Sequence, residues 1–244
     1  MEILSRDALP LGGFAGIVEH RLVTDSRIFG ERKTPVTFEG LGSMVYLADA
    51  QYKPFGSSGM HPHSETDVIS IIIDGRVSHK GSMEHGRDLV AGDVQVQRAG
   101  GEGFSHDEVN PDNAKNRMLQ VWALPEEKGH RAAYKSYTPK LEGVTRIYGG
   151  DKSQDDTFDS HTIMDIVHLK AGSHLDLNKD TLIYVITGEA DIIEADIDEQ
   201  GNSEPKNAEN IAINSIVNGD LVRSTAAKVI AINDVHLLIV SQNQ

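Results

Sequence analysis

The sequence of 244 residues contains no cysteine. Disulfide bonds and thiolate ligands are therefore excluded, and a bound metal ion would have to be held by nitrogen and oxygen atoms. Aromatic residues are scarce, at 5%. No apolar run approaches the roughly eighteen residues that span a membrane, and the first fourteen or so residues lack the basic start and apolar core of a signal peptide. We therefore expect a cytoplasmic protein.

Positive charge is also in deficit. The chain has 23 Lys and Arg against 37 Asp and Glu, which gives a formal net charge of -14 at pH 7. Such a field repels phosphate backbones and anionic membrane surfaces, so neither a nucleic acid nor a membrane is expected as a partner. With 39% hydrophobic and 25% charged residues, the composition is otherwise that of an ordinary globular protein.

Glycine is abundant, at 23 residues, and short strand-like runs alternate with turns along the chain. The β-branched run at residues 68–73 is followed by Asp74 and Gly75, which predicts a hairpin with residues 76–79 as its return strand. Residues 125–137 are polar and contain few strand formers. We expect them to form a linker or a short helix between two halves of the chain.

The second half repeats the pattern of the first. Residues 181–189 resemble residues 68–76, and residues 216–222 resemble residues 89–96 in the same order. The polar stretch at residues 196–210 can absorb the difference in spacing as a surface hairpin loop. We therefore predict an internal duplication, with chance similarity between β-rich segments as the alternative. Short, regularly spaced strands in each copy favour a sandwich or barrel.

Two pairs of potential metal ligands lie in the first half. His61 and His63 flank a proline, and alternation along a strand puts both imidazoles on one face. His106 and Glu108 have the same spacing. Two adjacent strands that each offer two inward ligands can hold one divalent transition metal and leave coordination positions open. The alternative for the histidine pair is a solvent-exposed polar pair without a metal.

The neighbouring polar residues are assigned lesser roles. Asp67 is expected to be a local hydrogen-bond partner, because simple alternation does not place it with His63. We expect His79, His85 and His130 to be surface residues or residues that contact the ligands.

In the second half, His174 and Asp176 resemble a relic of the first histidine pair, with exposed polar residues as the alternative. The partner strand there, residues 228–234, offers no counterpart to His106 and Glu108. One metal site is therefore expected, in the first half.

Taken in order, the motifs of the first half resemble those of the pirin family, which belongs to the bicupin proteins. The resemblance covers about residues 40–138, and these elements carry it: Gly59-x-His61-Pro62-His63, Asp74-Gly75-x-Val77-x-His79, Gly92-Asp93-x-Gln95, Ala99-Gly100, Gly103-x-x-His106-x-Glu108-x-Asn110-Pro111 and Leu119-Gln120-x-Trp122. It implies an all-β fold of two tandem cupin (jelly-roll) β-barrels. The N-terminal cupin, residues 1–138, would hold the metal, and the C-terminal cupin, residues 139–244, would be metal-free.

The resemblance also implies a ligand set. The family's three histidines and one glutamate fall on His61, His63, His106 and Glu108. Iron is the metal that it favours, with copper, manganese, nickel, cobalt and zinc as alternatives. The bend at residues 100–103 is one residue longer than the family's usual bend, and Asp67 stands where a glutamate is common. Residues 46–55 also lack the aromatic-rich segment that is typical of the family. The resemblance therefore does not determine the shape of the pocket or the substrate.

The function implied by the resemblance is that of a quercetin 2,3-dioxygenase-like oxidoreductase, which cleaves quercetin-type flavonols or related phenols with O2. The metal would stabilise the deprotonated substrate hydroxyl, and Glu108 would act as the catalytic base that accepts its proton. One alternative is a non-enzymatic pirin that binds a transcription factor or a metabolic enzyme according to the redox state of its metal. Another is an isomerase or storage-type cupin. Pairing of two barrels within one chain favours a monomer.

Overall fold

The protein consists almost entirely of β-strands. The computed structural model describes residues 1–83, 87–197, 203–205 and 212–243. Within these ranges, the helices are α1 (Ser26–Phe29) and the two short 3-10 helices η1 (Arg6–Ala8) and η2 (Gly30–Arg32). No helix in these ranges has the length and apolar character needed to cross a membrane. The prediction of an all-β fold is confirmed.

The first barrel is built from two facing sheets. The larger sheet has the strand order β12-β9-β6-β11-β4-β3-β2, and the smaller one has the order β5-β10-β7-β8. The bounds of these strands are β2 (Gly12–Phe14), β3 (Ile17–Thr24), β4 (Met44–Tyr52), β5 (His61–His63), β6 (Asp67–Asp74), β7 (Arg76–Gly81), β8 (Arg87–Val90), β9 (Val94–Arg98), β10 (Phe104–Val109), β11 (Arg117–Ala123) and β12 (Ala133–Tyr137).

The second barrel has the same plan. Its larger sheet has the order β1-β20-β16-β22-β14-β13, and its smaller sheet has the order β15-β21-β17-β18, with β19 also paired to β17. The bounds are β1 (Glu2–Ser5), β13 (Gly143–Gly150), β14 (Ser160–Leu169), β15 (His174–Leu177), β16 (Thr181–Thr187), β17 (Glu189–Ile197), β18 (Ser203–Pro205), β19 (Ile213–Val217), β20 (Asp220–Ser224), β21 (Ala227–Ala231) and β22 (Val235–Gln242).

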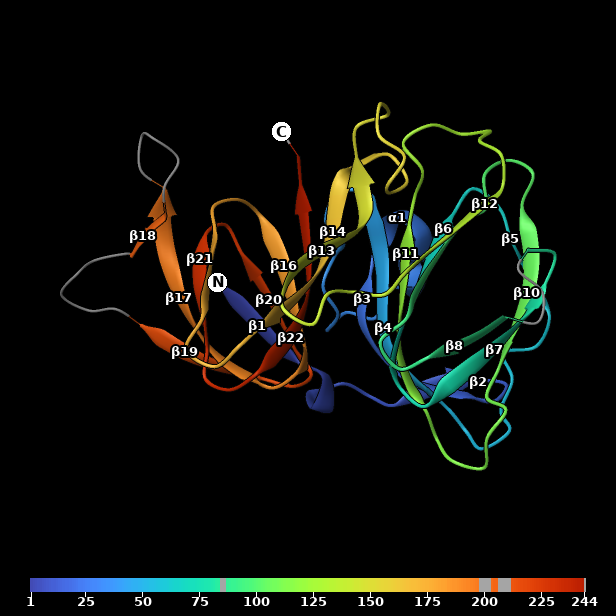
Figure 1. The fold of residues 1–244 in the computed structure, drawn as a ribbon, viewed down its shortest axis with the longest axis horizontal. Coiled ribbons are helices and arrows are strands. Elements are labelled where there is room, and N and C mark those ends of the chain that lie inside the picture. The colour runs from blue at the N-terminus through green and yellow to red at the C-terminus, as the bar shows by residue number, and fades with distance from the viewer. Residues whose placement is uncertain (84–86, 198–202, 206–211, 244) are drawn as a thin grey trace.

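The two barrels repeat one topology. The order β9-β6-β11-β4 recurs as β20-β16-β22-β14, and β5-β10-β7-β8 recurs as β15-β21-β17-β19. The predicted internal duplication is therefore confirmed, although most of the loop expected at residues 196–210 lies outside the described residues. One strand crosses between the halves, since the N-terminal β1 pairs with β20 and lies among the orange and red strands of the second barrel (Figure 1).

The predicted hairpin at Asp74 and Gly75 is wrong. Strand β6 pairs with β9 and β11, whereas β7 pairs with β8 and β10, so the chain turns a corner from one sheet into the other at Gly75. Gly75 has φ 69, and a Cβ at this position would lie 2.9 Å from the Cβ of Asn116. Glycine is needed at this position because the chain turns a corner of the barrel there. A hairpin turn requires the same backbone freedom, so the sequence could not distinguish the two.

The segment predicted as a linker or short helix ends in a strand. Residues 133–137 form β12, which pairs with β9 from Ala133 opposite Arg98 to Tyr137 opposite Val94. The helical alternative is therefore wrong. An unpaired edge of the larger sheet accounts for the difference, because it offers hydrogen bonds to a segment with little preference of its own.

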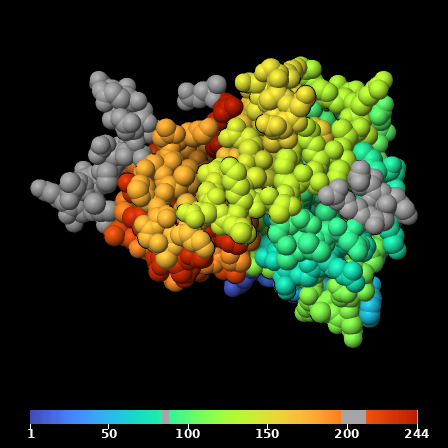
Figure 2. All heavy atoms as spheres, viewed as in Figure 1, coloured from blue at the N-terminus to red at the C-terminus, as the bar shows by residue number. Residues whose placement is uncertain are grey.

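The largest hydrophobic cluster lies between the barrels. Ile69 and Ile71 of β6 belong to the same buried cluster as Leu182 and Tyr184 of β16. The residues that alternate with Ile69 and Ile71 point into the barrel interior. Both faces of β6 are therefore buried, which explains why the strand is almost entirely aliphatic. The space-filling view shows the yellow-green chain that joins the halves lying across this face of the molecule (Figure 2).

The two barrel interiors differ in polarity. The second is filled by a cluster of aliphatic side chains that includes Ile183, Val185 and Val229. The first has smaller hydrophobic clusters, and several of its fully or nearly fully buried residues are polar. These polar residues are Glu19, Ser70, His79, Gln95, Gln97, His106 and Glu108. The first interior is thus where a functional site can be built.

Candidate metal centre

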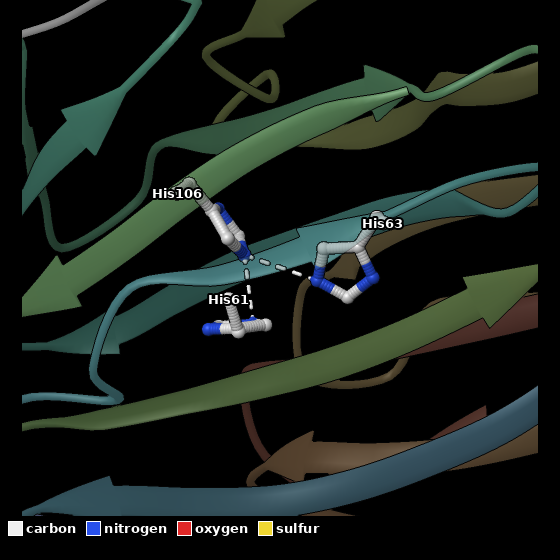
Figure 3. Close-up of side chains that lie close together, drawn as sticks. All are labelled: His61, His63 and His106. Atoms are coloured by element: carbon white, nitrogen blue, oxygen red, sulfur yellow. Dashed lines mark hydrogen bonds between the residues drawn. The ribbon is translucent and has the colours of Figure 1, made fainter. Parts of the chain in front are cut away.

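Three histidines meet on the smaller sheet of the first barrel. Strands β5 and β10 are antiparallel neighbours, with His106 opposite His61 and Phe104 opposite His63. The Nε2 atom of His106 lies 3.2 Å from the Nε2 atom of His61 and 3.2 Å from that of His63. All three rings therefore point their Nε2 atoms at one spot (Figure 3).

This arrangement fits a divalent metal ion. Two imidazole nitrogens bound at about 2.1 Å to one ion, at angles between about 90° and 109°, lie roughly 3.0 to 3.4 Å apart. The separations of 3.2 Å between Nε2 of His106 and the Nε2 atoms of His61 and His63 fall in that range. With no cysteine in the chain, nitrogen and oxygen donors are the ones available, and these suit several first-row ions.

Burial keeps the imidazoles of His63 and His106 neutral. It lowers the pKa of His63 to about 3, with further lowering from His106 and His61. It also lowers the pKa of His106 to about 3, with additional lowering from His61 and His79. The ring of His61 is oriented by the Gly59 carbonyl, which lies 2.7 Å from Nδ1 and can accept its proton. Neutral rings with a free Nε2 lone pair are the form that binds metal.

His79 supports the cluster from behind. It is fully buried, and its Nε2 atom lies 3.3 Å from Nδ1 of His106. If Nε2 of His106 binds a metal, Nδ1 carries the proton and donates a hydrogen bond to Nε2 of His79. The Nε2 atom of Gln97 lies 3.1 Å from the same atom of His79. Of the two roles predicted for His79, the contact with a ligand is thus the one that the structure supports, and the surface position is wrong.

Glu108 lies outside the group formed by the three histidines. Its carboxylate is buried and accepts hydrogen bonds from Tyr52 Oη at 3.0 Å, Ser70 Oγ at 2.9 Å and Gln95 Nε2 at 2.6 Å. These donors lie on three different strands. The spacing of His106 and Glu108 predicted the face on which Glu108 lies, but it could not predict donors from other strands. The only signals were single polar residues at inward positions, such as Ser70 in an otherwise aliphatic strand.

The other predicted residues lie apart from the cluster. Asp67 accepts hydrogen bonds from Arg98 Nε at 3.1 Å and from Tyr148 Oη at 2.9 Å. It is therefore a hydrogen-bond partner, but one that joins the two barrels. His130 lies in a loop, where its carbonyl accepts from the Gly101 amide at 2.9 Å. His85 lies outside the described residues.

The interpretation of His174 and Asp176 as a relic of the first pair is wrong. Both side chains are exposed and face out of the second barrel, whereas Leu175 pairs with Val229 and packs against the interior cluster. The inward-facing residues of β15 are thus Leu175 and Leu177, one residue out of step with the alternation predicted for His174 and Asp176. A slip of one residue reverses the face of every side chain in a strand. The alternative of surface polar residues is correct.

A small pocket lies beside the cluster. Aromatic and apolar side chains make up much of its wall, and both Glu19 and Glu108 line it. Trp122 stacks on Tyr46 with ring centroids 4.3 Å apart, and its ring lies 6.1 Å from that of His63. Phe14, 48% exposed, also lines the pocket. The histidine nitrogens thus face a space with flat, apolar walls, which suits a planar ligand.

Two cupin barrels in one chain, with converging histidines in one of them, define a bicupin. The crystal structure of the bacterial pirin YhhW of Escherichia coli, in complex with nickel(II), has the same fold. Its TM-score is 0.77 at 17% sequence identity, over 99% of this chain and 98% of that one. The bicupin prediction is confirmed.

Sequence comparisons match part of the chain to a known protein family. Residues 35–123 match the model of the pirin family. A Zymomonas mobilis protein provisionally named quercetin 2,3-dioxygenase is 34% identical over 107 residues, which is 43% of this chain and 45% of the relative. The quercetin 2,3-dioxygenase of Escherichia coli K12 is 30% identical over 40% of this chain and 42% of its own length. The match thus spans less than half of these relatives. The predicted resemblance to pirins is confirmed over residues 35–123, which lie in the first barrel.

Proposed function

We propose that this chain is a metal-dependent dioxygenase that cleaves quercetin-type flavonols with O2 at one site in the first barrel. The observation that carries the proposal is the convergence of three histidine Nε2 atoms beside an aromatic pocket, with that of His106 3.2 Å from each of the other two. The names of the relatives, which match the barrel that holds this site, support the same reaction.

The ligand set proposed is His61, His63, His106 and Glu108, with iron as the metal. A bound ion would supply Lewis acidity toward the substrate's hydroxyl and access to redox chemistry with O2. The convergence of their Nε2 atoms supports the three histidines as ligands. Glu108 has to turn from its present donors toward the cluster, and it lines the same pocket.

Glu108 is also the proposed base. A carboxylate has about four lone-pair sites, and three of them accept hydrogen bonds in this structure. The remaining capacity allows it to accept the proton of a substrate hydroxyl held next to the cluster. Tyr52, Ser70 and Gln95 hold the carboxylate in its present position, so Glu108 would act as the base when it is not bound to the metal.

The aromatic side chains of the pocket would position the substrate. Trp122 and Tyr46 stack at 4.3 Å and line the pocket. A flavonol packed against this wall would have its hydroxyl directed toward the histidines and would displace water from the site. Orientation of this kind lowers the barrier of a reaction without any new chemical group.

The test is turnover of quercetin in air. Protein loaded in turn with iron, copper, manganese, nickel and cobalt is mixed with quercetin, and the visible absorbance of the flavonol is followed with and without a chelator. We expect chelator-sensitive loss of absorbance with at least one metal, and a loss of rate of about 10²-fold or more in Glu108→Gln.

Absence of turnover with every metal would contradict the proposal. The non-enzymatic alternative would then gain support from a protein that is retained on the metal-loaded chain and released by the chelator. The matched control is His161→Ala, which removes an imidazole that is 78% exposed. It should leave turnover unchanged.

A further inference from the structure

A second buried carboxylate lines the pocket and has no part in the proposed ligand set. Glu19 is 3% exposed and lies on β3, in the sheet that faces the histidines. Its pocket neighbours Ile17, Ala50 and Met118 are apolar. Burial of a carboxylate among such groups is unfavourable unless donors compensate for the lost water. The unfavourable burial of Glu19 therefore indicates that this side chain has a role in ligand binding in the pocket.

Two side chains hold Glu19 in place. Arg21 Nε donates to one carboxylate oxygen at 2.7 Å, and Tyr46 Oη donates to the other at 2.9 Å. Burial and the charge of Glu19 raise the pKa of Tyr46 well above its usual value, so the phenol stays a donor. Of roughly four lone-pair sites on the carboxylate, two are occupied by these donors. The others can accept hydrogen bonds from a ligand.

An aromatic wall connects this carboxylate to the metal cluster. The ring of His63 lies 6.1 Å from Trp122, and Trp122 stacks on Tyr46 at 4.3 Å. The hydroxyl of Tyr46 then reaches Glu19. A planar ligand that lies along this wall, with one end at the histidines, carries its other end toward Glu19.

We propose that Glu19, positioned by Arg21 and Tyr46, is a specificity-determining residue that binds hydroxyl groups on the ring of the flavonol farthest from the metal. This inference rests on the proposed function. Glu19 can only accept hydrogen bonds, so it favours rings that carry hydroxyl donors. Together with Glu108 it places two carboxylates in one pocket, which disfavours substrates that carry a carboxylate of their own.

The experiment compares two flavonols with the same metal-binding head. Quercetin has two adjacent hydroxyls on its pendant ring, and galangin has none. The metal-loaded protein is titrated with each under anaerobic conditions, and binding is followed by the fluorescence of Trp122, the single tryptophan of the chain. Hydrogen bonds to a charged group predict that quercetin binds about tenfold more tightly or better.

Glu19→Gln should reduce that preference to about twofold while galangin binding is retained. Glu19→Asp keeps the charge and should give an intermediate preference, and metal content reports that each variant is folded. The control Glu31→Gln removes one charge from an exposed position and should keep the full preference. A preference that survives in Glu19→Gln, or that is absent from the unsubstituted protein, overturns the inference.

The outcomes separate this inference from the proposed function. If the preference depends on Glu19 but neither flavonol is turned over in air, the binding role stands and the dioxygenase proposal fails. If both flavonols are turned over with equal kcat/KM, the dioxygenase proposal stands and the role of Glu19 fails. Failure of both flavonols to bind overturns both.

Discussion

At the scale of single residues, His106 is the centre of the site because each neighbouring imidazole contacts it. His61 and His63 approach one of its nitrogens, and His79 approaches the other. The two-residue spacing predicted the first two contacts, since alternation fixes the face of each side chain. For His79 the sequence left a surface position and a contact with the ligands as alternatives. The distance of Glu108 from the cluster could not be predicted, because rotamers inside a barrel depend on donors from several strands.

His79→Ala tests the contact behind the ligand. Loss of the acceptor at 3.3 Å leaves His106 free to change its tautomer and orientation, so we expect metal affinity to fall by about 10- to 100-fold. Competitive titration with a chromophoric chelator measures this affinity. His20→Ala, which changes a ring bonded to the Leu9 carbonyl instead, is the control. Equal affinities in both variants would show that His79 has no such role.

At the scale of strands, the barrel is defined by its corners and by which face of each strand points inward. The pattern of glycine and β-branched residues located most strands, but Gly75 was compatible with a hairpin and with a corner. The face of β15 was also misjudged, because an alignment based on the turns at Gly188 and Gly219 cannot detect a shift in register in a strand that precedes both turns. Packing of Leu175 against the interior cluster decides the face.

A pair of substitutions tests the assigned faces of the second barrel. Val229 is fully buried, and Ile232 is 47% exposed. Val229→Asp should lower the free energy of unfolding by more than about 3 kcal/mol, since it buries a carboxylate without a partner. Ile232→Asp should change it by less than about 1 kcal/mol. Urea denaturation gives both values, and comparable losses would contradict the assignment.

At the scale of the whole molecule, the barrels form one unit through a shared hydrophobic cluster and two buried polar links. One link is Asp67 with Arg98 and Tyr148. In the other, Asp49 accepts hydrogen bonds from Arg117 and from Tyr184 of the second barrel. The duplication could be predicted from the sequence, but not these contacts, which join residues far apart in the chain.

Asp49→Ala tests the second link. Its removal leaves Arg117 and Tyr184 buried without their acceptor, and we expect a loss of about 3 to 5 kcal/mol in the free energy of unfolding. The exposed ion pair of Lys170 and Asp234 provides the control, and Asp234→Ala should leave the denaturation midpoint unchanged. Similar midpoints for both variants would contradict the structural role of Asp49.

The same residue contributes to acid sensitivity. Burial alone would raise the pKa of Asp49, but hydrogen bonds and charge from Arg117, Tyr184 and Arg6 outweigh it and leave the pKa lowered. The folded state therefore binds fewer protons than the unfolded state near the ordinary pKa of 3.8. The stabilisation is present above that pH and is lost as the pH falls through the lowered value. Asp49→Ala should thus show a smaller loss of stability with acid.

The central claim is that one divalent metal ion is bound by His61, His63 and His106. An anomalous difference map from a crystal of the iron-loaded protein, recorded at the iron absorption edge, tests it most directly. We predict a single strong peak in the first barrel, about 2.1 Å from each of the three Nε2 atoms. A peak elsewhere, or the absence of a peak between these histidines, would contradict the account.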